Sequence, residues 1–240
     1  MERFLDGKVV VVTGGTKGIG RAIAAALLQA GANVGICGRN GGAVTRAIAD
    51  LQEQAPGGTR VVGQVCDVAQ PDQVRSLFEF VDKELVGIDV LVNNAGVGEF
   101  GPAADLSIEQ WRQTIDTNLS GVFYCSREAL HRFRARGAGY IVNISSLAGK
   151  NPFAGGAAYN ASKFGLNGFS EAMMLDHRQD NVRVSYIMPG SVDTAFGRSS
   201  QPADWKIAPS DIAEIVLGLL RMPARTLVSR VEVRPSKPRK

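Results

Sequence analysis

The chain has 240 residues, of which 45% are hydrophobic and 21% charged, which fits one large domain with a sizeable core. Its formal net charge of +4 would allow nucleic-acid binding, but the charges are scattered along the chain, so we expect no nucleic-acid partner. No run reaches the roughly 20 apolar residues of a membrane span, and the first residues lack the apolar region of a signal peptide, so we expect a cytoplasmic protein without membrane association.

Three cysteines and two histidines are too few and too far apart for a disulfide framework, a CxxC pair or a histidine-rich metal site. We therefore expect no bound metal. The one concentration of charge is the C-terminal end, residues 235–240, which reads Pro-Ser-Lys-Pro-Arg-Lys. We expect residues 1–234 to form a single domain and residues 235–240 to form a flexible, solvated basic tail.

The first predicted element is a strand over residues 8–13, a β-branched run typical of a strand buried on both faces of a parallel sheet. A glycine-rich turn over residues 14–20 follows, and then a strong helix-forming segment over residues 21–28. Strand, glycine turn and helix in this order indicate a dinucleotide site. The start of a helix offers free N–H groups and a positive dipole end to a pyrophosphate.

A second predicted strand, residues 33–38, ends at Arg39. A NAD site usually carries an acidic residue here, about 20 residues after the glycines, which binds the ribose 2′-hydroxyl. Arg39 and Lys17 would instead attract a 2′-phosphate, which favours NADP(H) as the cofactor. The alternative is that Arg39 is a solvated residue at the end of a loop.

Strands and helices alternate along the rest of the chain. We predict helices near residues 44–54, 71–86, 107–136 and 157–179, and strands at 60–65, 89–92, 140–144, 182–188 and 226–233. The repeated β-α order predicts one α/β domain with a doubly wound, seven-stranded parallel sheet. The small-residue turn over residues 93–96, at the end of the fourth strand, would let a flat ligand approach the backbone closely.

The long helix predicted over residues 107–136 carries an apolar set that we expect to face the core, with Asn118 offered inward near its middle. The apolar set is Trp111, Ile115, Leu119, Val122 and Phe123.

Tyr159 and Lys163 are four residues apart in a predicted helix, so their side chains lie on one face. We expect the ammonium to lower the phenol pKa from its usual value near ~10 toward the range of a general acid or base. The alternative is a packed tyrosine beside a solvated lysine.

Five ordered motifs together closely resemble the short-chain dehydrogenase/reductase family, over residues 8 to about 220. They are the turn Thr13-Gly14-x-x-x-Gly18-Ile19-Gly20, the turn Asn93-Asn94-Ala95-Gly96, Ser146 thirteen residues before Tyr159, the Tyr159/Lys163 pair, and Pro189-Gly190. The resemblance implies a Rossmann fold with a seven-stranded sheet and helices on both faces.

The resemblance also implies a catalytic tetrad of Asn118, Ser146, Tyr159 and Lys163. Ser146 and Tyr159 would hydrogen-bond the substrate carbonyl, and Tyr159 would donate its proton as hydride arrives. Lys163 would hold the nicotinamide ribose, and Asn118 would anchor a water that reprotonates the lysine. The thirteen-residue interval favours Ser146 over its neighbour Ser145 as the catalytic serine.

Cofactor contacts carry over in the same way. The implied set comprises the pyrophosphate turn, two adenine contacts, the wall beside the ribose, the catalytic pair, and the segment that meets the nicotinamide and a phosphate. These residues are Gly14, Thr16, Lys17, Gly18, Ile19, Gly20, Arg39, Asp67, Val68, Asn94, Ala95, Gly96, Tyr159, Lys163, Pro189, Gly190, Val192 and Thr194.

Two departures from the family bear on the substrate and the assembly. The loop that folds over the substrate has only the fourteen residues 195–208, which indicates a fairly open site. The Asp-Gly-Gly ending that takes part in subunit packing of 3-oxoacyl-(acyl-carrier-protein) reductase-like members is absent. We expect a homodimer or homotetramer, with a dimer contact through the helices near 107–136 and 157–179.

We therefore predict an NADP(H)-dependent oxidoreductase that transfers a hydride between the nicotinamide and a carbonyl/secondary alcohol. A 3-oxoacyl thioester is the favoured substrate, and small ketones, sugars, steroids and polyols stay open. Glu99, Phe100, Leu147 and Phe153 are expected to line a pocket of mixed character. The alternative is an NADP(H)-binding regulator or scaffold without turnover, because fold does not dictate function.

Overall fold

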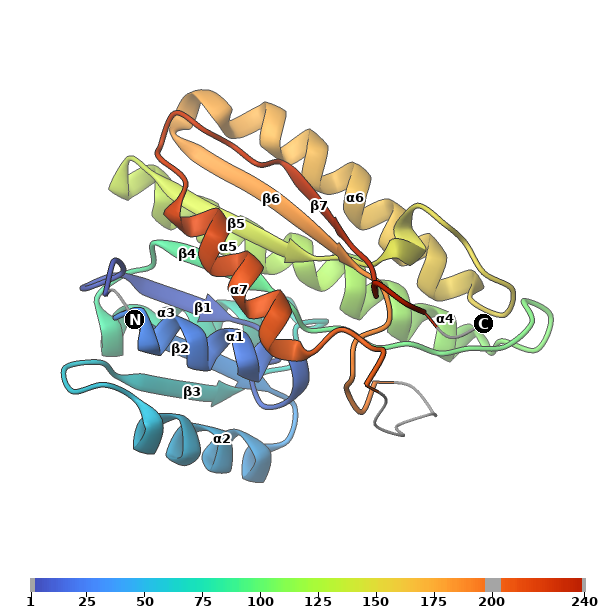
Figure 1. Ribbon diagram of the computed structural model, residues 1–240, viewed down its shortest axis with the longest axis horizontal. Coiled ribbons are helices and arrows are strands. Elements are labelled where there is room, and N and C mark those ends of the chain that lie inside the picture. The colour runs from blue at the N-terminus through green and yellow to red at the C-terminus, as the bar shows by residue number, and fades with distance from the viewer. Residues whose placement is uncertain (1–2, 197–203, 239–240) are drawn as a thin grey trace.

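A computed structural model describes residues 3–196 and 204–238 of the chain (Figure 1). The strands of its parallel sheet are β1 (Val9–Val12), β2 (Asn33–Gly38), β3 (Val61–Val65), β4 (Val90–Asn93), β5 (Gly139–Ile144), β6 (Val182–Pro189) and β7 (Arg230–Val233). The α-helices are α1 (Gly18–Gln29), α2 (Gly41–Gln54), α3 (Pro71–Leu85), α4 (Ile108–Ile115), α5 (Gly121–Arg136), α6 (Ala157–His177) and α7 (Pro209–Arg221). A π-helical turn covers Asp116–Ser120, and 3₁₀ turns cover Leu147–Gly149 and Arg178–Asp180.

Helices cover both faces of the sheet, and the central strand β1 is apolar on both sides. Val10 and Val12 of β1 belong to one core cluster with α1, α2 and α7. Val9 and Val11 point to the opposite face and pack in a second cluster with α3, α5 and α6. Successive side chains of a strand alternate between faces, which is why an unbroken valine run suits this position.

The strand order is β3-β2-β1-β4-β5-β6-β7, and all neighbours pair in parallel. The predicted doubly wound, seven-stranded parallel sheet is therefore confirmed. The chain order reverses direction between β1 and β4, which lie side by side in Figure 1. Open α/β sheets bind ligands in the crevice at the carboxyl ends of the strands at such a point.

Three elements differ from the prediction. The seventh strand starts at Arg230, so only the second half of the segment 226–233 pairs with β6. The long helix is divided into α4 and α5 by the π turn. We predicted no helix where α7 forms, although Pro209 at its first position and the apolar spacing after it are usable signals.

The predicted apolar stripe on α4 and α5 is wrong at two positions. Trp111 is 44% exposed and Phe123 is 47% exposed, whereas Val122 is buried. Small and polar side chains such as Thr114 and Thr117 fill the buried side instead. The π turn is the physical reason, because its wider i→i+5 turn shifts the helical phase between the two halves, so one continuous stripe cannot face the core.

Candidate active site

The turn after β1 is held against the turn after β4 by side-chain hydrogen bonds. The Thr13 hydroxyl accepts from the backbone N–H groups of Asn94 (3.0 Å) and Ala95 (3.1 Å). The Asn94 side chain donates to the carbonyls of Thr13 (3.0 Å) and Gly14 (3.2 Å). Our predicted site residues did not include Thr13, although its position between a buried strand and Gly14 is a usable signal.

The glycines of the first turn leave no room for a side chain. Gly14 has φ +65°, and a Cβ there would lie 2.9 Å from the Cα of Ala95. Gly18 also has a positive φ, of +55°, which favours glycine. A Cβ at Gly20 would overlap the Asn94 side chain and the Gly14 carbonyl. The turn is therefore a backbone cradle, as a pyrophosphate site requires.

The start of α1 is open to an anion. Lys17 is the N-cap, in an extended conformation, and its side chain makes no capping hydrogen bond. The first turn of α1 has no acidic residue, so its N–H groups and positive dipole end face no protein anion there. Thr194 reaches this point, since its Cγ2 would lie 3.3 Å from a Cβ at Gly18. The residues present fit a bound diphosphate.

The two residues expected to bind a 2′-phosphate are Lys17, in the turn before α1, and Arg39, at the end of β2. Arg39 directly follows β2, and the Thr16 side chain would lie 2.9 Å from a Cβ at Gly38, so the two segments are adjacent. Lys17 and Arg39 are both exposed. Within residues 3–196 and 204–238, neither side chain forms an ion pair with a carboxylate.

The two predicted adenine contacts follow β3. The Asp67 carboxylate accepts a hydrogen bond from the N–H of Ala69 (3.1 Å), which shapes the turn. Val68 is buried and packs on the start of α5, where a Cβ at Gly121 would lie 2.9 Å from it. The backbone of this turn is thus fixed from both sides. Its role toward adenine stays a prediction.

Asn118 lies fully buried in the π turn. Its side-chain oxygen accepts from the N–H of Val97 (2.8 Å), and its amide donates to the Val97 carbonyl (2.8 Å) and to the Ser162 hydroxyl (3.0 Å). Ser162 in turn donates to the Tyr159 carbonyl (2.8 Å). Asn118 therefore joins the segment after Gly96 to the helix that carries the Tyr159/Lys163 pair. Single-turn π-helices of this kind occur frequently at functional sites.

Tyr159 and Lys163 lie on α6, as predicted, with the Lys163 ammonium over the Tyr159 ring at 5.7 Å from its centroid. Lys163 is 5% exposed, and it donates to the Ile144 carbonyl (3.0 Å) at the end of β5. Burial lowers the Lys163 pKa to about 8, because desolvation penalises the charged form. The proposed alternative of a solvated lysine is thus wrong.

The predicted lowering of the Tyr159 pKa by Lys163 is also wrong in this structure. Burial raises the pKa of Tyr159 above its usual value, and a hydrogen bond with the Ser146 side chain acts in the opposite direction. The physical reason is that desolvation of the phenolate outweighs that hydrogen bond.

Ser146 and Ser145 have different surroundings after β5. The Ser146 hydroxyl accepts from the N–H of Ala148 (3.1 Å) and also reaches Tyr159. Ser145 donates to the Asn167 side chain (2.5 Å), whose amide donates to the Gly149 carbonyl (3.0 Å). Ser145 is therefore engaged in holding the turn, while Ser146 lies beside the phenol.

The segment after β6 closes the other side of the site. Gly190 follows Pro189, and a Cβ at Gly190 would lie 3.2 Å from the Leu147 side chain, next to Ser146 in the chain. Val192 forms a bridge with Ile207, whose hydrogen bonds run to the residues on either side of Val192. In a parallel bridge with this hydrogen-bond pattern, the N–H and carbonyl of Val192 point away from Ile207. A carboxamide could hydrogen-bond to them on that side.

A buried polar belt crosses the sheet behind these residues. The Asn93 amide donates to the Ser126 hydroxyl (3.1 Å) and to the Asn143 side chain (2.9 Å), and Asn143 donates to Ser170 (2.8 Å). All four side chains are buried. The belt links β4, β5, α5 and α6, and of its members only Asn93 was singled out in the sequence.

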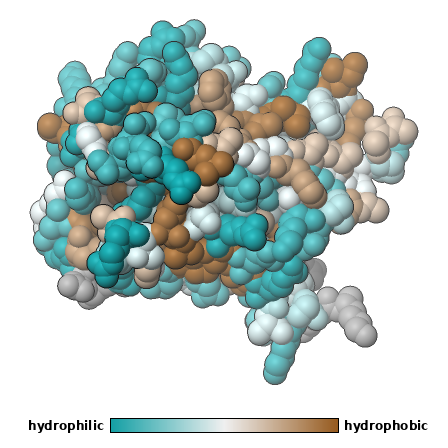
Figure 2. Space-filling model, turned by 90° about the horizontal axis from the view of Figure 1, so that it is seen from above, coloured by the Kyte–Doolittle hydropathy of each residue, from teal (hydrophilic) through white to brown (hydrophobic). Residues whose placement is uncertain are grey.

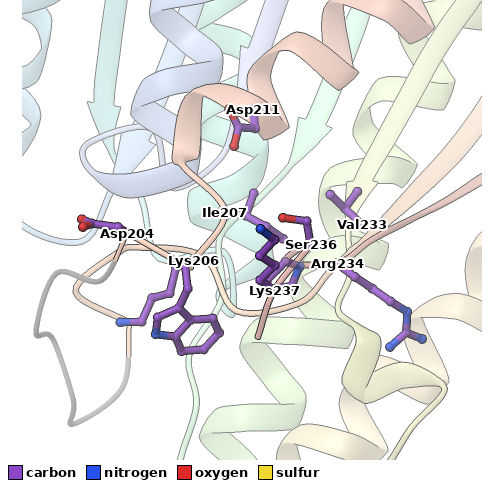
Figure 3. Close-up of a pocket in the computed structure, with 10 residues that line it drawn as sticks. Asp204, Lys206, Ile207, Asp211, Val233, Arg234, Ser236 and Lys237 are labelled. Atoms are coloured by element: carbon purple, nitrogen blue, oxygen red, sulfur yellow. The ribbon is translucent and has the colours of Figure 1, made fainter. Parts of the chain in front are cut away.

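A cavity of about 520 Å³ lies outside this constellation, between the segment that leads into α7 and the chain after β7 (Figure 3). Its lining residues include Lys206, Arg234 and Lys237, and none of the four candidate catalytic residues. The residues of the predicted tail up to Lys237 thus lie along this cavity. Residues 197–203 of the expected substrate loop and residues 239–240 of the tail lie outside the described residues.

Comparison with known proteins identifies the family. A family model described as short chain dehydrogenase matches residues 8–205. The chain belongs to the short-chain dehydrogenase family. It is accordingly an oxidoreductase of a family that uses NAD(P), and the predicted family membership and enzyme class are confirmed.

One curated short-chain relative and two solved structures are especially similar. The relative, "3beta-hydroxysteroid dehydrogenase" of Mediterraneibacter gnavus, is 37% identical over 214 residues, covering 89% of this chain and 75% of its own. A metagenomic short-chain oxidoreductase in complex with NADP is 36% identical with TM-score 0.85, covering 98% of this chain and 99% of its own. An alcohol dehydrogenase from Thermococcus sibiricus, complexed with 5-hydroxy-NADP, is 29% identical with TM-score 0.89, covering 97% and 98%.

Two kinds of feature are absent from the described part of this short-chain dehydrogenase. None of its helices is long and apolar enough to cross a membrane. No group of three or more His, Cys, Asp or Glu side chains within it could hold a metal ion.

Proposed function

We propose that this short-chain dehydrogenase is an NADP(H)-dependent enzyme that interconverts a carbonyl and a secondary alcohol. The observation that carries the proposal is the position of the Tyr159 phenol, beside Ser146 and under the buried Lys163 ammonium. This trio lies at the same sheet edge as the glycine cradle and the open start of α1, so one extended dinucleotide could reach from the cradle to the phenol.

The residues of the trio would have distinct roles. The nicotinamide cofactor, when bound, supplies or accepts a hydride. The hydroxyls of Ser146 and Tyr159 would hold the substrate oxygen, and the Tyr159 hydroxyl would give that oxygen a proton in the reducing direction. Lys163 would hold the nicotinamide ribose, and its pKa of about 8 lets it pass a proton to the remaining tyrosinate near neutral pH. Asn118 would hold the backbone after Gly96 in place through its two bonds to Val97.

The first experiment is a titration of the purified protein with NADPH and NADH, followed by turnover assays on a panel of ketones. The panel includes a 3-oxoacyl thioester, the substrate favoured by the sequence resemblance. NADPH binding with turnover of any carbonyl supports the proposal. Absence of turnover with every carbonyl, in a protein that binds NADPH, would instead support a regulator or scaffold.

Selectivity for NADP(H) is proposed to depend on Arg39 and Lys17. Arg39→Asp is expected to weaken NADPH binding by about tenfold to a hundredfold and to strengthen NADH binding, because a charge-assisted hydrogen bond is replaced by repulsion. Fluorescence titration measures both affinities. Arg178→Asp, on an exposed 3₁₀ turn, is the matched control for the change in charge. Unchanged NADPH affinity in Arg39→Asp would contradict the assignment.

We also propose that two copies associate through the outer faces of α5 and α6. Phe123 is 47% exposed and Phe164 is 46% exposed, and the Phe123 ring contacts Tyr124 and Phe169, so apolar surface spans both helices. Figure 2 views the molecule from above Figure 1, where α6 lies, and shows apolar patches among polar side chains. Exposed apolar patches of this kind mark interaction surfaces.

The dimer proposal predicts that Phe123→Asp combined with Phe164→Asp yields a monomer, because each change buries an unpaired charge in the contact. Light scattering coupled to size-exclusion chromatography measures the mass. Met222→Asp, at a partly exposed methionine after α7, is the control and should leave the mass unchanged. A wild-type protein that elutes as a monomer would refute the contact.

A further inference from the structure

Three phenylalanines from three different loops form one cluster with Tyr159. The Phe100 ring lies edge-on to the Tyr159 ring, with centroids 5.6 Å apart. Phe196 lies on Tyr159 at 5.8 Å, and Phe153 lies on Phe100 at 5.9 Å. Phe100 follows β4, Phe153 follows β5 and Phe196 follows β6, so each successive strand of the site contributes one ring.

The backbone of these loops is built to bring the rings together. The N–H of Gly101 donates to the Gly155 carbonyl (2.8 Å), which ties the loop of Phe100 to the loop of Phe153. The Asn160 amide donates to the Phe153 carbonyl (3.0 Å) and holds the second loop to α6. These bonds fix the separation of the two rings through the main chain.

Two glycines leave room for the rings. A Cβ at Gly98 would lie 2.6 Å from the Phe100 ring and 3.0 Å from the Phe196 ring. A Cβ at Gly156 would lie 2.7 Å from the Phe153 ring. Side chains at either position would displace the phenylalanines, so the chain has small residues where the cluster needs them.

The three rings nevertheless stay partly open to solvent. Phe100 is 42% exposed, Phe153 is 46% exposed and Phe196 is 44% exposed. Clustered apolar surface that stays exposed on a monomer marks a binding site. Here the cluster packs on the ring of Tyr159, whose hydroxyl would meet the substrate oxygen, so the group attached to the reacting carbon would pack on these rings.

The chemistry of the rings restricts that group. Phenylalanine has no hydrogen-bonding atom, so a hydroxylated or charged substituent would lose water without gaining a partner. Glu99, the charged neighbour of Phe100, accepts a hydrogen bond from Gln110 of α4 (3.3 Å). A rigid ring also loses fewer rotatable bonds on binding than a linear acyl chain, and tilted aromatic side chains accept flat rings in offset or edge-on contact.

We propose that Phe100, Phe153 and Phe196 form the substrate wall, and that the wall selects ketones or secondary alcohols whose reacting carbon carries an aryl or fused-ring hydrocarbon group. This inference rests on the proposed function. It distinguishes ring ketones from sugars and polyols, which need polar partners, and from 3-oxoacyl thioesters, whose pantetheine-like arm is long, polar and flexible.

The test compares three carbonyl probes with NADPH: α-tetralone as a rigid fused-ring ketone, cyclohexanone as a small one, and the N-acetylcysteamine thioester of acetoacetate. We expect the highest kcat/KM with α-tetralone. Phe100→Ala and Phe153→Ala are each expected to lower kcat/KM for α-tetralone by about tenfold or more, mainly through KM, and for cyclohexanone by less than about threefold. NADPH affinity should not change.

The matched control is Leu175→Ala. Leu175 is 56% exposed and lies on the helix of Tyr159, but about 24 Å further along it at the usual rise per residue. Its change should leave all three kcat/KM values intact. Saturation-transfer NMR on the NADP-loaded protein reports α-tetralone binding independently of turnover, and the signal should weaken in both phenylalanine variants.

The outcomes separate the two proposals. Turnover that favours the thioester or cyclohexanone, with no selective loss in the phenylalanine variants, overturns the aromatic wall and leaves the proposed reaction standing. If the protein binds NADPH but oxidises it with none of the probes and with no other carbonyl, the proposed reaction is overturned, and the aromatic wall with it.

Discussion

Tyr159→Phe is expected to lower kcat by about a thousandfold or more and to leave NADPH affinity within about twofold, since proton transfer by a positioned group contributes ~10²–10⁴ in rate. The substitution removes one oxygen atom and keeps the ring that contacts Phe100 and Phe196. The loss should therefore fall on the chemical step, with KM for the carbonyl changing much less. Stopped-flow measurement of NADPH oxidation isolates that step.

Tyr124→Phe provides the control for this prediction. Tyr124 is partly buried on α5, its ring contacts Phe123, and it has no place in the candidate site. Its variant should retain wild-type turnover. If Tyr159→Phe retained wild-type turnover as well, the phenol would not be the acid, and the proposed reaction would need another proton donor. If it kept a biological effect while losing turnover, the role of regulator or scaffold would be favoured.

Lys163→Met is expected to abolish most activity and at the same time to stabilise the folded protein at neutral pH. Burial lowers the Lys163 pKa to about 8, and the difference from an unperturbed lysine corresponds to roughly 3 kcal/mol of free energy against folding. Methionine fills a similar volume without charge but leaves the Ile144 carbonyl unpaired, which costs about 1–2 kcal/mol. The net expectation is a gain of about 1–2 kcal/mol, or a Tm higher by about 2–8 °C.

The sign of the pH dependence follows from the direction of the shift. The folded protein has the lower pKa for Lys163, so the unfolded chain binds more protons between about pH 8 and the unperturbed lysine value near ~10.4. Wild-type stability should therefore rise relative to Lys163→Met across that window, and the advantage of the variant should shrink.

Thermal unfolding of both proteins across this pH range measures the effect, and Lys83→Met at the exposed end of α3 is the control with no expected trend. A Lys163→Met protein that is less stable than wild type at neutral pH would show that the buried ammonium contributes net stability.

The parts of the fold that depend on local pattern could be predicted from the sequence. Val9 to Val12 read as a strand buried on both sides because each face of the sheet is covered, and Gly14, Gly18 and Gly20 read as a cradle because a tight backbone turn next to a helix start needs them. Helical spacing alone placed Tyr159 and Lys163 on one face, whereas their catalytic role was implied by the family resemblance.

What escaped prediction depends on contacts between distant segments. The π turn at Asn118 changes which residues face the core, and no periodicity in the sequence predicts this turn. Burial of Tyr159 and Lys163 sets their pKa values, and it comes from loops and strands far away in the chain. Phe196 is an isolated aromatic residue in the sequence, and only the fold brings it to Tyr159.

The polar belt through Asn93, Asn143, Ser126 and Ser170 determines how accurately the Tyr159 hydroxyl is positioned. Apolar surfaces can slide past one another at little cost, whereas a buried amide or hydroxyl that loses its partner costs about 1–3 kcal/mol. Sliding α6 by one residue along β5 would break the bond between Ser170 and Asn143. That bond lies about three helical turns from Tyr159. The belt thus fixes the position of α6 along β5. It positions the Tyr159 phenol from a point that lies far beyond the reach of any substrate.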